Sequence, residues 1–267
     1  MADHQQLLIV GLGNMSGAML AGWLAAGVEP ARFAALGRRP ITAPAGVQTF
    51  SDPAQASGHD AIMLGFKPQQ LGGVAPTLQA IAGDGVTVYS LLAGITLSQL
   101  REAFPEARAH VRVMPNLASR IGKSPVILAE SGLDEAGRDT AFSLFDKLGV
   151  AVWLDDETYY NLATALAGSG PGFVYRFIDA LAAAATELGL EQASAQNLAL
   201  TMVEGASALA ARAELSPGEL ADRVASPGGM TREGLNVLDQ DAALRNLLIE
   251  TLRATADRGA ELAAGPK

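Results

Sequence analysis

The 267-residue sequence contains no cysteine and only three histidines. Without cysteine the chain forms no disulfide and offers no thiolate as a nucleophile or metal ligand. The histidines, His4, His59 and His110, are scattered and lack the spacing of metal ligands, so we expect no metal site. Any catalytic activity must therefore come from other groups.

Positive charge is also scarce. Lysine and arginine number 19 against 28 acidic residues, which gives a net charge of −9 and argues against a surface for nucleic acid or anionic membranes. The alanine-rich stretch 173–190 contains Arg176, Asp179 and Glu187 and is too polar to span a membrane. No basic segment precedes the first apolar run, so we predict no signal peptide. We expect a soluble, cytoplasmic protein with no nucleic-acid or membrane partner.

Short apolar runs alternate with helical segments in the first half of the chain. Helix starts are indicated by Asp52-Pro53-Ala54-Gln55 and by the capping box Thr96-Leu97-Ser98-Gln99. Most of the runs lack a period of two, as strands buried on both faces do. We therefore predict a parallel, doubly wound sheet. Its strands are predicted at 7–10, 33–36, 61–65, 86–91, 109–113 and 126–128.

The pattern changes after Leu154, and no further strand is predicted. One helix face is marked by Phe173, Phe177, Leu181 and Leu188, and the next by Leu198, Met202 and Leu209. Alanine-rich helices with few charges pack closely and leave an apolar face for another subunit. Alternatively, the alanine content reflects only the base composition of the genome. We expect a first domain at 1–160 and an all-helical second domain at 161–267.

A glycine-rich loop follows the first predicted strand and opens a helix. Gly11 permits the tight turn, and Gly13 lets a pyrophosphate approach the backbone. The helix N-terminus at Asn14 and Met15 then faces the anion. Ser16 occupies the position of the third glycine in the G-x-G-x-x-G pattern. In this context the motif predicts dinucleotide binding, and the alternative is a plain strand-to-helix turn.

The second predicted strand ends without the acidic residue that would hold the ribose 2′-hydroxyl of NAD. Arg38 and Arg39 stand there instead, and guanidinium groups suit a 2′-phosphate. The sequence therefore favours NADPH, with NADH as the alternative cofactor. Two solvated surface arginines are the other interpretation.

Two further strand ends complete this edge of the predicted sheet, where ligands bind in such folds. Lys67-Pro68 follows the third predicted strand and Ala93-Gly94 follows the fourth. Small residues and a proline leave room there for ribose and nicotinamide, although each stretch alone also fits a plain turn.

The segment 226–231, Ser-Pro-Gly-Gly-Met-Thr, lies in the helical half. Adjacent glycines cost a helix interior about 1 kcal/mol each, so Gly228 and Gly229 indicate a need for bare backbone. Their N–H groups beside a helix start would make a carboxylate or phosphate cradle. The alternative is an ordinary helix start capped by Ser226. Ser216-Pro217-Gly218-Glu219 shows what a full capping box looks like in this chain.

Taken together, these motifs resemble the pyrroline-5-carboxylate reductase family. The resemblance implies NAD(P)H-dependent reduction of a cyclic imine carboxylate to proline, the last step of proline synthesis. It also implies an N-terminal Rossmann-type sheet followed by an all-helical C-terminal domain that dimerises, with dimers often building larger rings. It rests on 11–15 (Gly-Leu-Gly-Asn-Met), Lys67-Pro68, 93–96 (Ala-Gly-Ile-Thr), Met114-Pro115-Asn116, Gly168-Ser169-Gly170-Pro171 and 226–229.

By position in these motifs, the resemblance makes Ser226 and Thr231 the residues that contact the imine or its carboxylate. Gly228, Gly229, Met230 and Glu214 would complete the substrate site, and Asn116 would lie near the nicotinamide. Two departures stand out. Met230 replaces a threonine of the family, and 117–119 (Leu-Ala-Ser) replaces Thr-Pro-Ala.

Hydride reduction of a protonated imine needs no covalent nucleophile, which suits a chain without cysteine. The protein has to dock the carboxylate, align the imine and exclude water. Another imine or hydroxyacid reductase of the same two-domain plan, such as one for a six-membered ring, is one rival interpretation. A catalytically idle NADP-binding protein, acting as a redox sensor or scaffold, is the other.

Overall fold

The computed structural model describes residues 5–263. The chain forms two compact units. The first extends to Ser169 and takes up the chain again from Thr255, and the second is Gly170–Ala254. The domain division at residue 160 stays a prediction; the compact units part after Ser169.

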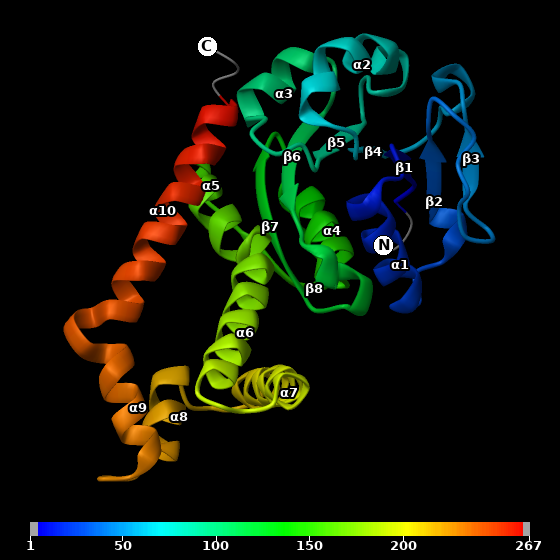
Figure 1. Cartoon of the computed structure of the whole chain (residues 1–267). Helices are drawn as coiled ribbons and strands as arrows, with labels where there is room; N and C mark the ends of the chain where they lie inside the picture. The colour runs from blue at the N-terminus through cyan, green and yellow to red at the C-terminus, as the bar shows by residue number, and fades with distance from the viewer. Residues whose placement is uncertain (1–4, 264–267) are drawn as a thin grey trace. The chain divides into compact units, whose positions relative to one another are not determined.

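The first unit is built on an eight-stranded sheet with the order β3-β2-β1-β4-β5-β6-β7-β8 (Figure 1). All pairs from β3 to β6 are parallel, which is the Rossmann strand order. The strands are β1 Leu7–Val10, β2 Phe33–Leu36, β3 Gln48–Phe50, β4 Ala61–Leu64, β5 Thr87–Ser90, β6 Ala109–Met114, β7 Ser124–Ser131 and β8 Gly149–Trp153.

The structure corrects the predicted sheet in two respects. β7 runs antiparallel to β6, because the connection 115–123 is shorter than the dozen or so residues that a parallel crossover takes. β3 and β8 were missed. β3 is three residues long and mostly exposed, and in β8 only Ala151 is buried while Val150 and Val152 face outward. Neither strand has the continuous apolar run that marks a doubly covered strand.

Helices cover both faces of the sheet, so the predicted doubly wound architecture is confirmed. Leu7 and Ile9 of β1 join the core under α1 and α4, whereas Leu8 and Val10 join the core under α2 and α3 (Figure 1). In the first of these cores, Trp23 is fully buried and donates from Nε1 to the Leu144 carbonyl at 2.8 Å. The helices of this unit are α1 Asn14–Ala25, α2 Leu71–Leu78, α3 Leu97–Ala103, α4 Glu135–Asp146 and α5 Tyr160–Ala163.

The predicted helix starts differ in outcome. α3 begins with the predicted capping box: Gln99 N–H donates to Thr96 Oγ1 at 3.2 Å, and Thr96 N–H donates to Gln99 Oε1 at 2.9 Å. The signal at Asp52 produces only a 3₁₀ turn, Pro53–Gln55, although Asp52 accepts from Ala54 N–H as a cap should.

No strand follows Trp153 among residues 154–263, as predicted. The helices there after α5 are α6 Gly170–Glu187, α7 Gln192–Ala210, α8 Pro217–Val224, α9 Met230–Asp239 and α10 Ala243–Ala263, whose last residues belong to the first unit.

α6 and α7 pack against each other through small side chains. Ala182, Ala195 and Ala199 are buried between them. Most of the large residues predicted to mark the helix faces are exposed on the protomer, with Leu198 at 59% and Leu209 at 72%. The alanines thus allow close packing, and the leucines remain as an apolar surface on the protomer.

Candidate dinucleotide and anion sites

The glycine-rich loop lies where the strand order of the sheet reverses, between β1 and β4. Gly11 has a φ of +92°, and its N–H donates to the Leu36 carbonyl at 2.8 Å. A Cβ on Gly11 would lie 3.1 Å from the Gly65 carbonyl oxygen. The backbones after β1 and β4 therefore approach each other so closely that only glycine fits at residue 11. In open α/β sheets this crevice is the ligand site.

The start of α1 is bare. Gly13 is the N-cap residue, with extended backbone and no side-chain cap, and its carbonyl accepts the first helical bond from Gly17. The N–H groups of Asn14 and Met15 donate to no other described residue. Unpaired N–H groups and the helix dipole together favour a phosphate at this position.

Ser16 shows how the loop tolerates a residue other than the third glycine. Its side chain is 1% exposed, and its hydroxyl has no hydrogen-bond partner within residues 5–263. It faces Gly65. A methyl group on Gly65 would overlap Ser16 Oγ and would lie 2.6 Å from the Gly11 carbonyl oxygen. The small residue needed for close helix–strand packing is thus supplied by Gly65, from the opposite side.

A cavity of about 630 Å³ adjoins this loop. Of the predicted cofactor residues, Gly11 and Arg38 line it. Arg38 and Arg39 are exposed and form no ion pair with another described residue, so both guanidinium groups are free to bind an anion. Arg39 is not part of the lining. The sequence analysis missed most of the rest of the wall, which includes Ser51, Gln69, Gly73 and Thr77.

The missed residues have a structural explanation. Ser51 follows β3, the short exposed strand that the sequence pattern does not mark. Gly73 and Thr77 lie on α2, a helix whose two glycines and internal proline conceal its helical pattern. The adjacent glycines Gly72 and Gly73 were the one sequence feature that could have marked this part of the cavity wall.

The remaining predicted cofactor residues follow the carboxyl ends of β4, β5 and β6. Lys67 and Pro68 open a 3₁₀ turn, where Lys67 N–H donates to Gln70 Oε1 at 3.2 Å. Ala93 and Gly94 form a β-turn, with Gly94 at a φ of +78°.

Asn116 lies after β6 and is 5% exposed. Its side chain joins two parts of the first unit. Oδ1 accepts from Ala118 N–H at 2.9 Å, and Nδ2 donates to the Ala167 carbonyl at 3.0 Å.

In the second unit, residues 226–229 form a β-turn rather than a helix start. Gly229 N–H donates to the Ser226 carbonyl at 2.9 Å, Pro227 is the second residue, and Gly228 is the third with a φ of +70°. This is the type II pattern. α9 begins only at Met230, with Gly229 as a bare N-cap. The alternative in which Ser226 caps a helix is therefore wrong.

The turn defines which N–H groups of this segment are free. Gly229 N–H is taken by Ser226, so it is not part of a cradle. The N–H groups of Met230 and Thr231 donate to no other described residue. Both side chains are exposed, Met230 at 95%. The predicted anion cradle is thus narrower than the sequence indicates.

Glu214 lies in an exposed bend between α7 and α8. No hydrogen bond or ion pair joins its carboxylate to another described residue. Further along the chain, Arg232 holds the start of α9 by donating to Asp222 Oδ1 at 2.8 Å and to the Ala225 carbonyl at 3.3 Å.

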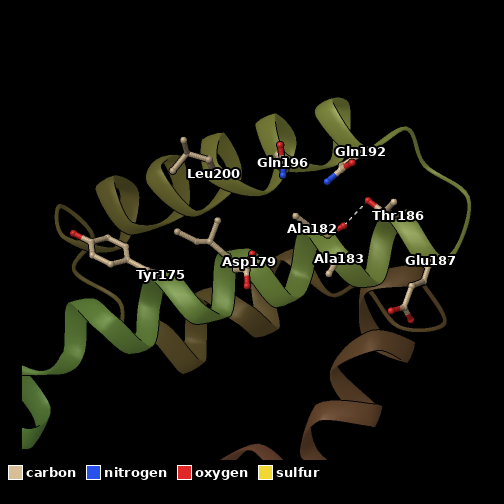
Figure 2. Close-up of a pocket in the computed structure, with 10 residues that line it drawn as sticks. Tyr175, Asp179, Ala182, Ala183, Thr186, Glu187, Gln192, Gln196 and Leu200 are labelled. Carbon is tan, nitrogen blue, oxygen red and sulfur yellow. Dashed lines mark hydrogen bonds between the residues drawn. The ribbon is translucent and has the colours of Figure 1, made fainter.

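A second cavity, of about 620 Å³, lies between α6 and α7. Figure 2 shows its wall, with Tyr175, Asp179 and Leu200 around an alanine floor. Thr186 turns its hydroxyl to its own helix and donates to the Ala182 carbonyl at 2.9 Å. No sequence motif indicates this cavity.

Residues 5–263 contain neither a helix apolar and long enough to cross a membrane nor a group of three or more acidic or histidine side chains placed to hold a metal ion. Of the histidines, His4 lies outside the described residues. His110 is buried, and its Nε2 lies 2.9 Å from the Phe104 carbonyl oxygen. Burial lowers the pKa of this imidazole, so it serves the core as a neutral ring.

Comparisons with known proteins agree with this arrangement. The signature described as pyrroline-5-carboxylate reductase dimerisation matches residues 157–262. The chain is 31% identical to a pyrroline-5-carboxylate reductase of Pseudomonas aeruginosa, over 97% of both chains. It also matches the structure of one from Coxiella burnetii, with a TM-score of 0.91, 30% identity, and coverage of 97% of this chain and 99% of that one. A pyrroline carboxylate reductase of Plasmodium falciparum solved with NADP bound shares the fold, with a TM-score of 0.83, 23% identity, and coverage of 98% of this chain and 99% of that one.

These features define a dinucleotide-dependent oxidoreductase with a separate helical unit. The chain belongs to the pyrroline-5-carboxylate reductase family.

The contact between Ser16 and Gly65 yields a stability prediction. Gly65→Ala is expected to lower the free energy of unfolding by about 1–3 kcal/mol, because the new methyl group has no space. Ser16→Ala removes a buried hydroxyl without a partner and is expected to leave stability unchanged or to raise it. Urea denaturation followed by circular dichroism measures both.

Gly72→Ala is the matched control, because a Cβ there meets nothing within 4 Å and replaces a helical glycine. A Gly65→Ala variant as stable as the Gly72→Ala variant would contradict the close approach.

Proposed function

We propose that this protein reduces 1-pyrroline-5-carboxylate to L-proline with NADPH, the final step of proline biosynthesis, in the cytoplasm. One observation carries the proposal: a chain of this family has two bare helix starts, one after the glycine loop and one after the Ser-Pro-Gly-Gly turn. The first suits a pyrophosphate and the second suits a carboxylate. A cyclic imine carboxylate and a dinucleotide are the two anions that the reaction requires.

The cofactor site fits a dinucleotide because its backbone is stripped of side chains where a pyrophosphate would approach. Gly11, Gly13 and the free N–H groups of Asn14 and Met15 would hold the pyrophosphate, with Ser16 packed beneath them. Arg38, with Arg39 beside it, would bind the 2′-phosphate that distinguishes NADPH from NADH. NADH remains the weaker alternative.

The turns after β4, β5 and β6 would receive the rest of the cofactor. Lys67, Pro68, Ala93 and Gly94 lie at this edge and leave room for ribose and nicotinamide. When bound, the reduced nicotinamide supplies the hydride. The protein's own task is then to bind, orient and shield the two reactants.

The substrate would bind at the start of α9. N–H groups of Met230 and Thr231 would hold its carboxylate, and Gly228 and Gly229 shape the turn that leaves them bare. The hydroxyls of Ser226 and Thr231 would bond the carboxylate or the imine nitrogen. Neither is a general acid, because an alcohol is a poor proton source at neutral pH. Glu214, in the bend before α8, would lie near the ring.

The helical unit carries the family's dimerisation signature, so the protein self-associates through it. Exposed Leu198 and Leu209 supply the apolar surface of an obligate interface. We propose a homodimer as the basic state and a larger ring as a further assembly. Sedimentation velocity at micromolar concentration separates the two, and a monomer there would exclude both.

Turnover with two substrates tests the function directly. NADPH oxidation is expected with pyrroline-5-carboxylate and at a lower kcat/KM with its six-membered homologue. The reverse order would make the protein a reductase of larger rings. No turnover with either imine, in a preparation that binds NADPH, would favour the idle NADP-binding protein.

The cofactor preference depends on Arg38 and Arg39. Replacing both by alanine is expected to raise the KM for NADPH tenfold or more and to leave that for NADH nearly unchanged. Loss of a charge-assisted phosphate contact is worth about 1.5–3 kcal/mol. Steady-state kinetics with both cofactors measure the effect. If the variant has the same KM as the wild type for each cofactor, the 2′-phosphate binds elsewhere.

The substrate site is tested on three residues of the 226–231 segment. In Gly229→Ala the new Cβ would lie 2.5 Å from Ser226 Oγ and displace it, so turnover should fall while NADPH binding persists. Thr231→Ala removes one hydroxyl and should lower kcat/KM by about ten- to a hundredfold. Met230→Thr should be mild, because only the backbone at 230 is assigned a role.

Kinetics of the three variants, beside NADPH titration by fluorescence, decide the matter. Wild-type turnover in Gly229→Ala together with loss of turnover in Met230→Thr would disprove the backbone cradle.

A further inference from the structure

Two motifs of the sequence, Met114-Pro115-Asn116 and Gly168-Ser169-Gly170-Pro171, have no joint role in the function proposed above. The structure joins the first motif to Ala167, the residue just before the second, by one hydrogen bond from Asn116 Nδ2 to the Ala167 carbonyl at 3.0 Å. We propose that Asn116 is a positioning residue that fixes the turn 164–168, rather than a ligand of the cofactor. The activity readout of this inference rests on the proposed function.

The turn is a π-helix over Thr164–Gly168, in which Ser169 N–H donates to the Thr164 carbonyl five residues back at 3.0 Å. Such turns are rare and occur often at functional sites. This one also leaves Thr164 Oγ1 buried without a partner among the described residues. It stands where the first compact unit ends, after Ser169.

Covalent structure explains why this turn needs Asn116. In an α-helix the Ala167 carbonyl would accept from the N–H four residues on, but that residue is Pro171, which has no N–H. Asn116 Nδ2 donates to this carbonyl in its place.

Asn116 is itself held firmly enough to act as a fixed point. Its own N–H donates to Ser124 Oγ at 2.9 Å, and its Oδ1 accepts from Ala118 N–H at 2.9 Å. Close packing supports the same junction, since a Cβ added to Gly168 would lie only 3.3 Å from Met114 Cγ. The loop after β6, which borders the proposed nicotinamide position, and the turn through which the chain passes to the substrate-binding unit are thus fixed to one another.

A double-mutant cycle with Pro171→Ala tests the assignment. Asn116→Ala is expected to lower kcat/KM for the imine at least tenfold while the Kd for NADPH, measured by fluorescence, stays within twofold. Pro171→Ala restores an N–H that can donate to Ala167. In that background the loss caused by Asn116→Ala should shrink to less than threefold.

Asn116→Asp is the second variant in case the alanine variant folds poorly. It keeps the acceptor for Ala118 N–H but replaces the donor to Ala167 with an oxygen, so it should behave as Asn116→Ala does. Asp134→Ala is the matched control. Asp134 accepts from Gly137 N–H at 2.8 Å at the start of α4, as Asn116 accepts from Ala118 N–H. Removing it should leave kcat/KM unchanged in both backgrounds.

Two results would overturn the proposal. One is a tenfold or greater rise in the Kd for NADPH in either Asn116 variant, which would make Asn116 a cofactor ligand. The other is an equal loss of kcat/KM with and without Pro171. Hydrogen exchange of amides 164–170, faster in Asn116→Ala and slower again with Pro171→Ala, tests the link without any turnover. The exchange experiment therefore tests the Asn116–Ala167 link even if the protein does not reduce this imine.

Discussion

Whether the backbone N–H groups at each helix start are hydrogen-bonded or left free governs the rest of this structure. Each helix leaves its first N–H groups without partners inside the helix. Among the α-helices of residues 5–263 that begin from extended backbone, a side chain satisfies these groups in four cases: Thr96 at α3, Asp134 at α4, Glu191 at α7 and Ser216 at α8. In two cases, Gly13 at α1 and Gly229 at α9, the cap is a glycine and no side chain accepts. The two bare starts are the two proposed anion sites, one in each compact unit.

Bare starts require neighbours that leave the backbone accessible, and this explains where the small residues are. At α1 the requirement extends across the sheet, because Gly11 and Gly65 approach within a distance that excludes a side chain. Ser16 occupies the space that Gly65 vacates. At α9 the requirement is met locally, by a turn in which Pro227 and Gly228 have the conformations that turn needs. The first site therefore depends on tertiary packing and the second on four consecutive residues.

This difference decides how far each part could be predicted from the sequence. The doubly covered strands, the capping boxes at Thr96 and Ser216 and the strand–loop–helix setting of the glycine loop are local signals, and the structure confirms them. The antiparallel β7 and the exposed edge strand β8 depend on connection length and neighbours that no local pattern records. The wall of the cavity at Arg38 was missed for the same reason, since Ser51, Gly73 and Thr77 come together only through the fold. Around Ser226 the motif was recognised, but the hydrogen bond that occupies Gly229 N–H was not.

Backbone carbonyls near helix starts also need donors, and this explains the position of Asn116, which the sequence motif placed in the cofactor site. Pro171 has no N–H to donate to the Ala167 carbonyl in an α-helical pattern, and Asn116, 51 residues away in sequence, donates to that carbonyl. A side chain with both polar ends engaged in this way has less freedom to bind a ligand than an unpaired one. Arg38 and Arg39 are the contrasting case, since neither forms an ion pair with a described residue. In the proposed function the unpaired arginines at the sheet edge bind the cofactor, and in the further proposal the hydrogen-bonded amide of Asn116 positions the backbone.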